Sequence, residues 1–480
     1  MDSGAVLAVD QGTSSTKALV VGPDGDVLAA VEIPVRLQVV GDGGVEQDPR
    51  ELVESIIEAG RRAIEDARCP IAAVGIANQG ETVVAFDPAS GDALTLAVSW
   101  QDRRAASVTE RLRDMGDRLR EVTGLPLDPY FTAPKLRWLA DRSPEGAHVV
   151  GIDAWLNLQL TGRLVTDAAT ASRSLVLDLD EREWSSEAAT AFGLEVGNLP
   201  EVTDCAGSLG ETSAFGPLLP VTALCVDQQA ALVGEGCIAP GEAKCTYGTG
   251  AFLLVTTGRH ARRSSKGLAA SVAWQIGDDV SYCLDGQIYT AGSAVTWLIR
   301  MGLLSQASEL DDVAGAASLD SHVVCVPSFA GLGAPLWEPA VMAQFEGIGL
   351  DTGRAEIVRS VLDGLAAQVV QLVKAAEADM GTPLSVLRVD GGLTRSSVLM
   401  QRQADLLGVP VEVYASPHAT ALGIASLARN GRSLSTDLAP AAMPVGAQFE
   451  PRISRDAAAA YLARFEVAIE NARNASRSSK

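Results

Sequence analysis

The chain has 480 residues, of which 47% are hydrophobic and 20% charged, so it can bury large cores and is not a mostly disordered protein. Its formal net charge of −22 repels phosphate backbones and anionic lipid, which argues against nucleic acid and membranes as partners. The length favours two or three domains.

Cysteine usage and hydropathy point to the compartment. The seven cysteines include no C-x-x-C pair, so the sequence predicts a reduced, cytoplasmic protein. No segment approaches 18 uninterrupted apolar residues and no basic stretch precedes the first apolar run. Neither a transmembrane span nor a signal peptide is therefore expected.

The first half opens with a predicted three-strand meander, followed by a helix and buried strands. Asp48 and Pro49 supply an N-cap and a first-turn proline for a helix that ends near residue 67. Two later runs are continuously apolar, as in strands buried on both faces, and each ends at a polar cluster. The expected strands are 5–9, 17–21, 27–35, 71–76 and 221–226, with polar clusters at 78–81 and 227–229.

The second half repeats the opening pattern of a strand, a Gly/Thr turn and another strand at 243–256, which suggests an internal duplication. A Gly- and Pro-rich stretch before it places a domain boundary near residue 240. Apolar residues at helical spacing predict a long core helix over 354–380, and a strand is expected over 384–389.

Two turns have residues suited to binding an anion. Segment 10–17, DQGTSSTK, joins two predicted strands and offers backbone N–H groups and hydroxyls on one side; an ordinary polar hairpin is the alternative. Gly248-Thr249-Gly250 is a second turn of this kind, so the two turns could clamp phosphates from opposite sides. No G-x-x-x-x-G-K-[ST] segment occurs, which excludes a P-loop.

Other candidate residues have two readings each from the sequence alone. Asp227 follows a buried strand, where it could be a helix N-cap or a general base. Trp100, Tyr130 and Phe252 lie beside polar residues or glycine, but each taken singly is more typical of a core position.

Eight segments in order carry a resemblance that covers nearly the whole chain. They are DQGTSS at 10–15, NQGET at 78–82, WQDRR at 100–104, DPYF at 128–131, DQQAA at 227–231, TYGTG at 246–250, GLGAPLW at 331–337 and DGG at 390–392. On these segments the chain resembles the FGGY family of carbohydrate kinases. The resemblance implies an α/β fold of two actin-like, ribonuclease H-like domains with an ATP cleft between them. The expected divisions are a polyol-binding domain at 1–240, a nucleotide-binding domain at 241–470 and a flexible tail at 471–480.

The resemblance also implies a reaction and residue roles. The enzyme would use ATP and Mg²⁺ to phosphorylate a terminal hydroxyl of a small polyol, with glycerol as the first candidate, and a homodimer is compatible with it. Asp227 would be the general base and Asp10 would hold Mg²⁺ through water. The implied phosphate contacts are Gly12, Thr13, Ser14, Lys17, Thr249 and Gly250. The residues implied to border the nucleoside are Gly292, Thr296, Gly391, Gly392 and Ser396. The implied residues of the polyol site are Gly80, Glu81, Tyr130, Asp227 and Gln228, with Trp100 and Phe252 as apolar walls.

One position departs from the resemblance. Glycerol-phosphorylating members of the family typically have Arg immediately before the Glu, and this chain has Gly80 before Glu81. Losing a guanidinium leaves substrate hydroxyls unpaired and is expected to leave space. A longer polyol such as erythritol or threitol, or a ketose such as xylulose, is therefore an alternative substrate, unless Lys or Arg from elsewhere refills the gap. A second alternative is a non-catalytic sensor, although such a protein would be expected to have lost Asp10 or Asp227.

Overall fold

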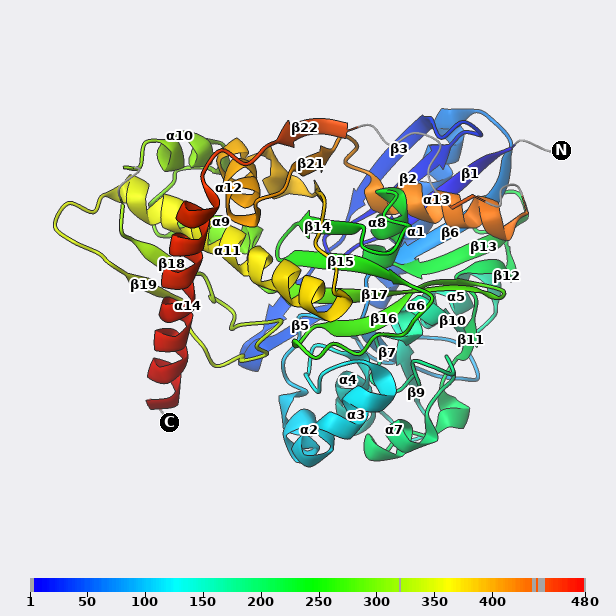
Figure 1. Cartoon of the computed structure of the whole chain (residues 1–480). Helices are drawn as coiled ribbons and strands as arrows, with labels where there is room; N and C mark the ends of the chain where they lie inside the picture. Colours follow the sequence, from blue (N-terminus) through cyan, green and yellow to red (C-terminus); the bar gives the residue numbers. More distant parts are fainter. Residues whose placement is uncertain (1–3, 319–320, 434–436, 439–444, 479–480) are drawn as a thin grey trace.

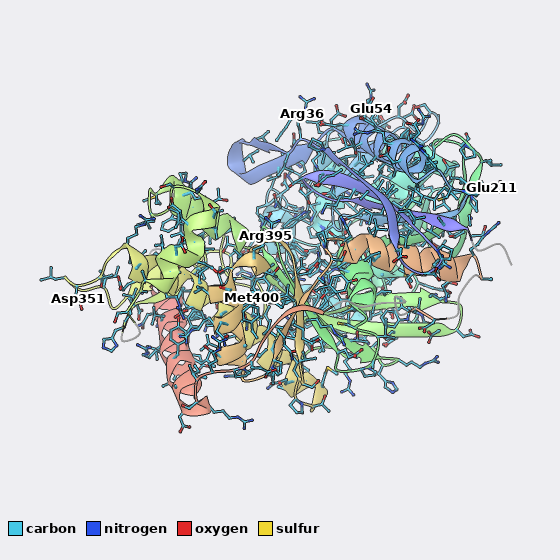
Figure 2. All side chains as sticks on the ribbon, turned by 90° about the horizontal axis from the view of Figure 1, so that it is seen from above. Arg36, Glu54, Glu211, Asp351, Arg395 and Met400 are labelled. Atoms are coloured by element: carbon cyan, nitrogen blue, oxygen red, sulfur yellow. The ribbon has the colours of Figure 1, made fainter. Side chains whose placement is uncertain are left out.

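The computed structural model describes residues 4–318, 321–433, 437–438 and 445–478. Two mixed β-sheets lie next to each other, and a group of short helices with a small third sheet lies below them in Figure 1. In the view from above, Arg36, Glu54 and Glu211 lie on the side of the N-terminal sheet, and Asp351 lies at the opposite end of the molecule (Figure 2).

The N-terminal sheet has six strands in the order β12-β13-β6-β1-β2-β3. Its strands are β1 (Ala5–Gln11), β2 (Ser15–Val21), β3 (Val27–Pro34), β6 (Ile71–Asn78), β12 (Ala206–Thr212) and β13 (Leu219–Val226). Strands β1, β6 and β13 are parallel, while β2 and β3 form the predicted meander with β1. Helix α1 (Pro49–Ala67) packs on β2 and β3, and the Asp48 side chain accepts a hydrogen bond from the Arg50 N–H as the predicted N-cap.

The C-terminal sheet has seven strands in the order β16-β17-β15-β14-β20-β21-β22. Its strands are β14 (Ala243–Tyr247), β15 (Ala251–Gly258), β16 (Ala269–Ile276), β17 (Asp279–Ile288), β20 (Leu387–Asp390), β21 (Val411–Tyr414) and β22 (Val445–Phe449). An antiparallel hairpin, β14–β15, lies beside the parallel strands β20 and β21, which matches the arrangement of β1–β2 beside β6 and β13. The predicted repetition of the opening pattern is therefore present in the strand order.

The remaining strands are short. A third sheet, ordered β4-β5-β8-β7-β9, supports the region that carries Trp100, and two further strand pairs complete the strands. Their bounds are β4 (Gln38–Val40), β5 (Gly44–Gln47), β7 (Val83–Phe86), β8 (Ala97–Val98), β9 (His148–Gly151), β10 (Val165–Asp167), β11 (Glu201–Thr203), β18 (Val324–Val326) and β19 (Gln344–Glu346).

Helix α11 (Arg354–Met380) has the predicted bounds and packs in the C-terminal core against β15, β17 and α12. Short helices predominate in the first half, and longer ones in the second. The helices beyond α1 and α11 are α2 (Ala106–Arg111), α3 (Gly116–Thr123), α4 (Thr132–Ala140), α5 (Ile152–Thr161), α6 (Ala168–Ala171), α7 (Ser186–Ala191), α8 (Asp227–Gly234), α9 (Gly292–Arg300), α10 (Leu310–Gly315), α12 (Ser397–Leu407), α13 (Ala419–Gly431) and α14 (Arg455–Ser478).

Helices α8 and α13 join the two halves of the chain. α13 comes late in the sequence, yet it packs on α8 and on strands β1, β6 and β13 of the N-terminal sheet. The crossing is close because Gly234 of α8 and Gly423 of α13 face each other's backbone, and a Cβ on either would overlap a carbonyl oxygen of the other helix. Glycine at both positions is what permits this approach.

The C-terminal end differs from its prediction. Residues 471–478 are not a flexible tail, because they form the last turns of α14 and Ala472 is buried in the C-terminal core. The polar and serine residues of this segment occupy the outer face of the helix, while Tyr461, Phe465 and Ile469 continue its apolar face inward. Across the described residues no helix combines the length and apolarity needed to cross a membrane.

Candidate active site

The carboxyl ends of the parallel strands β1, β6 and β13 meet at one edge of the N-terminal sheet. The Gln79 N–H donates to the Gln11 carbonyl at 2.9 Å, which ties the ends of β6 and β1 together. Glu81 follows with φ +54, a left-handed conformation that is uncommon outside glycine and recurs at functional sites. Asp227 is the first residue of α8, and Val226 rather than Asp227 takes the N-cap position. The N-cap alternative for Asp227 is therefore wrong.

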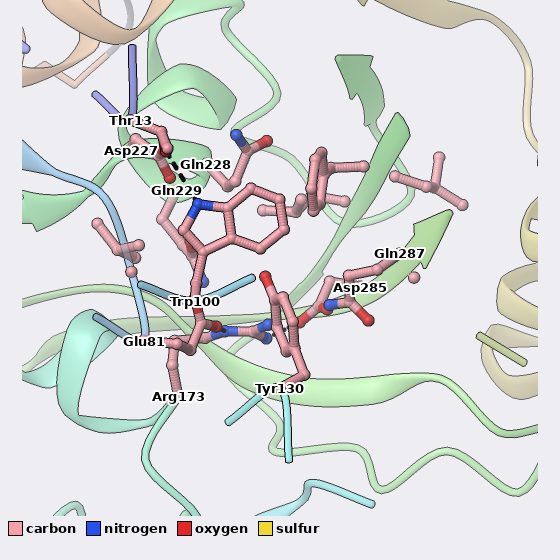
Figure 3. Close-up of a pocket in the computed structure, with 16 residues that line it drawn as sticks. Thr13, Glu81, Trp100, Tyr130, Arg173, Asp227, Gln228, Gln229, Asp285 and Gln287 are labelled. Atoms are coloured by element: carbon pink, nitrogen blue, oxygen red, sulfur yellow. Dashed lines mark hydrogen bonds and ion pairs between the residues drawn. The ribbon is translucent and has the colours of Figure 1, made fainter. Parts of the chain in front are cut away.

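All seven residues predicted to bind the polyol line one cavity (Figure 3). They are Gly80, Glu81, Trp100, Tyr130, Asp227, Gln228 and Phe252. The cavity has a volume of about 70 Å³. The seven predicted residues therefore surround a single small space.

Aromatic rings form the apolar side of the cavity. Trp100 makes edge-to-face contacts with Tyr130 and Phe252, with 5.9 Å between ring centroids in both pairs. The Trp100 indole Nε1–H donates to the Thr13 hydroxyl at 2.9 Å, drawn as a dashed line in Figure 3. This hydrogen bond fixes the ring next to the turn between β1 and β2. The cavity is thus walled by rings whose orientation is set by polar contacts.

The amide of Gln228 is oriented by a buried lysine. Lys244 lies on β14, and its ammonium donates to Gln228 Oε1 at 2.6 Å and to the Thr246 hydroxyl at 2.7 Å. Because the amide oxygen is engaged by Lys244, the amide nitrogen of Gln228 is the group left to donate within the cavity.

Two half-buried carboxylates, Asp10 and Asp227, lie at the strand ends. Burial raises the pKa of Asp227 to about 7, and repulsion from Asp10 adds to this while Lys244 opposes it. Burial likewise raises the pKa of Asp10 to about 6, with Lys17 lowering it and Asp390 raising it. A group with a pKa near neutrality can exchange a proton at physiological pH, which suits a general base.

The space expected beside Gly80 is restricted on one side by Val226. A Cβ placed on Gly80 would lie 2.9 Å from Cγ2 of Val226, closer than carbon atoms pack. Val226 therefore crowds one side of the position where a side chain at residue 80 would begin. The guanidinium of Arg173 also lines the cavity and forms ion pairs with Glu81 and Asp285. An arginine from another segment thus lies next to Glu81, as in the alternative in which Lys or Arg from elsewhere takes the place of the missing one.

A second, larger cleft of about 1000 Å³ adjoins the first, and Trp100 lines both. Of the residues predicted to contact phosphate or nucleoside, it brings together Thr249, Gly292, Thr296 and Gly392. Apolar rings flank the cleft as well, since Trp297 and Phe329 lie with ring centroids 4.5 Å apart and both line it. A flat apolar wall beside a glycine turn is suited to a nucleotide.

Comparison with known proteins identifies the family. The model of the FGGY carbohydrate kinase N-terminal domain matches residues 5–234, and that of the C-terminal domain matches residues 243–429. The chain belongs to the FGGY family of carbohydrate kinases. It is 40% identical to a glycerol kinase of Alkalilimnicola ehrlichii and 39% identical to one of Ralstonia pickettii, in each case over 98% of both chains.

Solved structures of FGGY kinases share the fold of this one. The crystal structure of Plasmodium falciparum glycerol kinase with ADP superposes with a TM-score of 0.89 at 29% identity, covering 98% of each chain. A ligand-bound xylulose kinase from Lactobacillus acidophilus reaches a TM-score of 0.87 at 21% identity. The second likeness concerns the fold alone. The chain is thus a phosphotransferase with an alcohol acceptor, built on the two-domain actin-like fold.

The two glycine hairpins of this FGGY kinase are tight turns closed by their own backbones. The Gly12 N–H donates to the Ser15 carbonyl at 3.0 Å, and the Gly248 N–H donates to the Gly250 carbonyl at 2.9 Å. The second hairpin also contacts the start of α9, where the Gly292 N–H donates to the Gly248 carbonyl at 2.9 Å. The exposed Ser14 lies at the tip of the first hairpin, and Lys17 lies opposite Asp10 on β2.

Six of the eleven predicted nucleotide contacts line neither the cleft nor the polyol cavity, namely Gly12, Ser14, Lys17, Gly250, Gly391 and Ser396. Ser396 caps α12, because its hydroxyl accepts from the Leu399 N–H and donates to Asp311. Gly250 and Gly391 each lie against backbone where a Cβ would overlap a carbonyl. Their backbone N–H groups stay candidates for nucleotide contact, which is a prediction.

Sequence reasoning missed several residues that line the polyol cavity. They include Arg173, Asp285 and Gln287, which lie in none of the segments that carry the family resemblance. Gln229 was also missed, although it lies in the segment 227–231. No local pattern marks Arg173, which follows the short helix α6, because its two partners lie 92 and 112 residues away in the sequence.

Proposed function

We propose that this enzyme phosphorylates glycerol with ATP to give glycerol 3-phosphate. The observation that carries the proposal is the small cavity of about 70 Å³ beside Asp227, which all seven predicted polyol-binding residues line. Glycerol, with six non-hydrogen atoms, suits so small a cavity better than a pentitol or pentulose, each of which has ten. The relatives named as glycerol kinases, similar over the whole chain, support the same substrate.

Asp227 is the general base in the proposed reaction. Its carboxylate takes the proton of the attacking terminal hydroxyl as the hydroxyl oxygen forms a bond to the γ-phosphorus of ATP. The bond between that phosphorus and the β–γ bridging oxygen breaks, and ADP leaves with its electron pair. Phosphoryl transfer of this kind depends mainly on positioning and on neutralising charge. The raised pKa of Asp227, about 7, makes its carboxylate a stronger base than an exposed one.

Polar and apolar groups divide the binding of glycerol between them. Glu81 accepts from a substrate hydroxyl, and Gln228 donates from the amide nitrogen that Lys244 leaves free. Tyr130 contributes its hydroxyl and part of the wall, and the rings of Trp100 and Phe252 cover the carbon chain. Such a division is typical of small-ligand sites, which are largely apolar with a few fixed polar groups.

ATP and Mg²⁺ belong in the larger cleft and at its junction with the polyol cavity. The proposed phosphate contacts are Gly12, Thr13, Ser14, Lys17, Thr249 and Gly250, and the proposed nucleoside contacts are Gly292, Thr296, Gly391, Gly392 and Ser396. Asp10 fits a site for Mg²⁺, because it repels Asp390 nearby and Oδ1 of Asp390 is buried without a hydrogen bond in the described part of the chain. Carboxylate oxygens are ligands that Mg²⁺ prefers, and the ion supplies neutralisation of phosphate charge.

The domain division and location complete the proposal. The polyol domain comprises residues 1–240 and the nucleotide domain residues 241–470, and closure of the two would exclude water from the transferred group. A cytoplasmic location is supported by seven cysteines, none of which forms a disulfide.

A coupled assay of ADP release tests the proposal. The panel consists of glycerol, dihydroxyacetone, erythritol, threitol, xylitol, xylulose and ribulose, and the control variant is Asp227→Asn. We expect the highest kcat/KM with glycerol, and a loss of about 10²–10⁴-fold in kcat for Asp227→Asn from removal of the base. A higher kcat/KM for any four- or five-carbon substrate would overturn glycerol in favour of the longer polyol or ketose. An Asp227→Asn variant with unchanged kcat would overturn the role of Asp227.

A further inference from the structure

Arg173 is a buried arginine inside the polyol cavity that no part of the proposed reaction has used. It follows the short helix α6 and its side chain is only 5% exposed. Its Nε donates to Glu81 at 2.8 Å, and its Nη1 donates to Asp285. Figure 3 shows the guanidinium lying between these two carboxylates and passing beside the ring of Tyr130.

The two ion pairs leave part of the guanidinium unengaged. Arginine has five N–H donors in a planar fork. Glu81 takes the N–H on Nε and Asp285 takes one on Nη1, while Nη2 makes no hydrogen bond within the described residues. Because Arg173 lines the cavity together with Asp227 and Gln228, the unengaged donors are available to a molecule bound there.

The surroundings hold the guanidinium in one place. Glu81 follows β6 of the N-terminal sheet, and Asp285 lies on β17 of the C-terminal sheet, so the side chain is fixed from two sides. The Phe131 ring packs against it with 5.2 Å between the guanidinium carbon and the ring centroid. A substrate that needed this space would have to break ion pairs between buried charges, which is costly.

We propose that Arg173 binds substrate and limits its length, supplying the guanidinium that Gly80 lacks. Nη2 donates to a hydroxyl of glycerol that is not the one phosphorylated, and the fixed guanidinium closes the cavity to longer polyols. The inference rests on the proposed function, in which the substrate is glycerol. The rival role for Arg173 is purely structural, namely neutralising Glu81 and Asp285.

Deoxy analogues of glycerol distinguish a role of Arg173 in substrate binding from a purely structural role. The enzyme is assayed with glycerol, with 1,2-propanediol, which lacks one terminal hydroxyl, and with 1,3-propanediol, which lacks the central one. Arg173→Lys is compared with the wild type because it keeps a positive charge between the two carboxylates but loses the forked donors. Arg263→Lys is the matched control, since Arg263 also joins the two halves of the chain through Asp180 and the Val122 carbonyl but lies outside the cavity.

In the wild type we expect kcat/KM to fall by about 10- to 100-fold on removal of the hydroxyl that Arg173 binds, the range of a hydrogen bond to a charged group. In Arg173→Lys the ratio of kcat/KM for glycerol to kcat/KM for the deoxy analogue should shrink to a few-fold, mainly through a higher KM for glycerol. The rate with erythritol relative to the rate with glycerol should rise. Arg263→Lys should keep the wild-type ratios.

Three outcomes decide the matter. Unchanged analogue ratios in Arg173→Lys, with a lower melting temperature alone, would show a structural role and overturn the inference. No turnover of glycerol by the wild type would instead overturn the proposed function. If Arg173→Lys does not fold, the double variant Arg173→Gln with Asp285→Asn removes a buried carboxylate along with the guanidinium, and the same loss of discrimination is required of it.

Discussion

Adding a single methyl group at Gly80 should destabilise the enzyme. The backbone of Gly80 does not lie in the left-handed region, so alanine fits its conformation, and such a change ordinarily stabilises a protein by about 0.4–1 kcal/mol through the unfolded chain. Here the new Cβ would lie 2.9 Å from Cγ2 of Val226, whereas ordinary contacts are 3.4–4 Å. The overlap is therefore at least half an ångström, by subtraction of 2.9 from 3.4.

Val226 has little freedom to relieve that overlap. It is 2% exposed, and a β-branched side chain is restricted at χ1. Inserting a methyl group into packing of this kind costs about 1–3 kcal/mol. After subtracting the gain from the unfolded chain, we expect Gly80→Ala to lower the free energy of unfolding by about 1–2 kcal/mol. Because Val226 precedes Asp227, kcat/KM should fall as well.

Chemical denaturation followed by circular dichroism measures this change, with two comparisons built in. Gly116→Ala is the control, because Gly116 has helical φ −55 and ψ −44 and a Cβ there meets Leu127 at an ordinary 3.8 Å. It should be neutral or stabilising. Val226→Ala opens space for the new methyl group, so the double variant with Gly80→Ala should be more stable than the sum of the single changes predicts. Additivity within about 0.5 kcal/mol, or a stabilising Gly80→Ala, would refute the packing argument.

Two further changes test groups that support the site. The Lys135 ammonium is buried and donates to the carbonyls of Pro129, Tyr130 and Phe131. Lys135→Met should lower the free energy of unfolding by about 1–3 kcal/mol and raise the KM for glycerol, because Tyr130 is held less firmly. An unchanged KM for glycerol would contradict this positioning role. Burial raises the pKa of Asp153 to about 7, so the folded state keeps a proton that the unfolded state releases above pH 4, and stability falls as pH rises toward 7. Asp153→Asn has no carboxyl group to titrate, so its free energy of unfolding relative to that of the wild type should rise by about 2–3 kcal/mol from pH 5 to pH 7, measured by denaturation. A difference in the free energy of unfolding that does not change with pH would contradict the raised pKa.

Local patterns in the sequence predict much of this fold. Helix 354–380 is found with its predicted bounds because its apolar positions recur at helical spacing and a glycine follows at residue 381. The strands that end at Gln11, Asn78 and Val226 are as buried as their apolar composition predicts. Because parallel strands bring their carboxyl ends to one edge of the sheet, the polar clusters that follow these strands are expected to lie close together.

The features that escaped prediction depend on contacts between distant segments. Helix α14 continues to Ser478 because Ala472 reaches the C-terminal core, which a serine-rich composition does not reveal. The predicted strand 384–389 begins only at Leu387, since Leu387 to Val389 are the residues that pair with β21. The packing of α13 on the N-terminal sheet requires Gly234 and Gly423 to meet, although 189 residues separate them by subtraction of their numbers.

The residue before Glu81 shows why a motif alone does not determine a substrate. Glycine at position 80 removes a donor from the motif and, read locally, predicts a roomier pocket. In the folded chain Val226 crowds the place where a side chain at residue 80 would start, and the guanidinium of Arg173, from another segment, pairs with Glu81. Chemistry is recognised by the atoms that face the ligand, whichever segment carries them. A three-carbon substrate is therefore supported by the cavity even though the motif that usually accompanies it is incomplete.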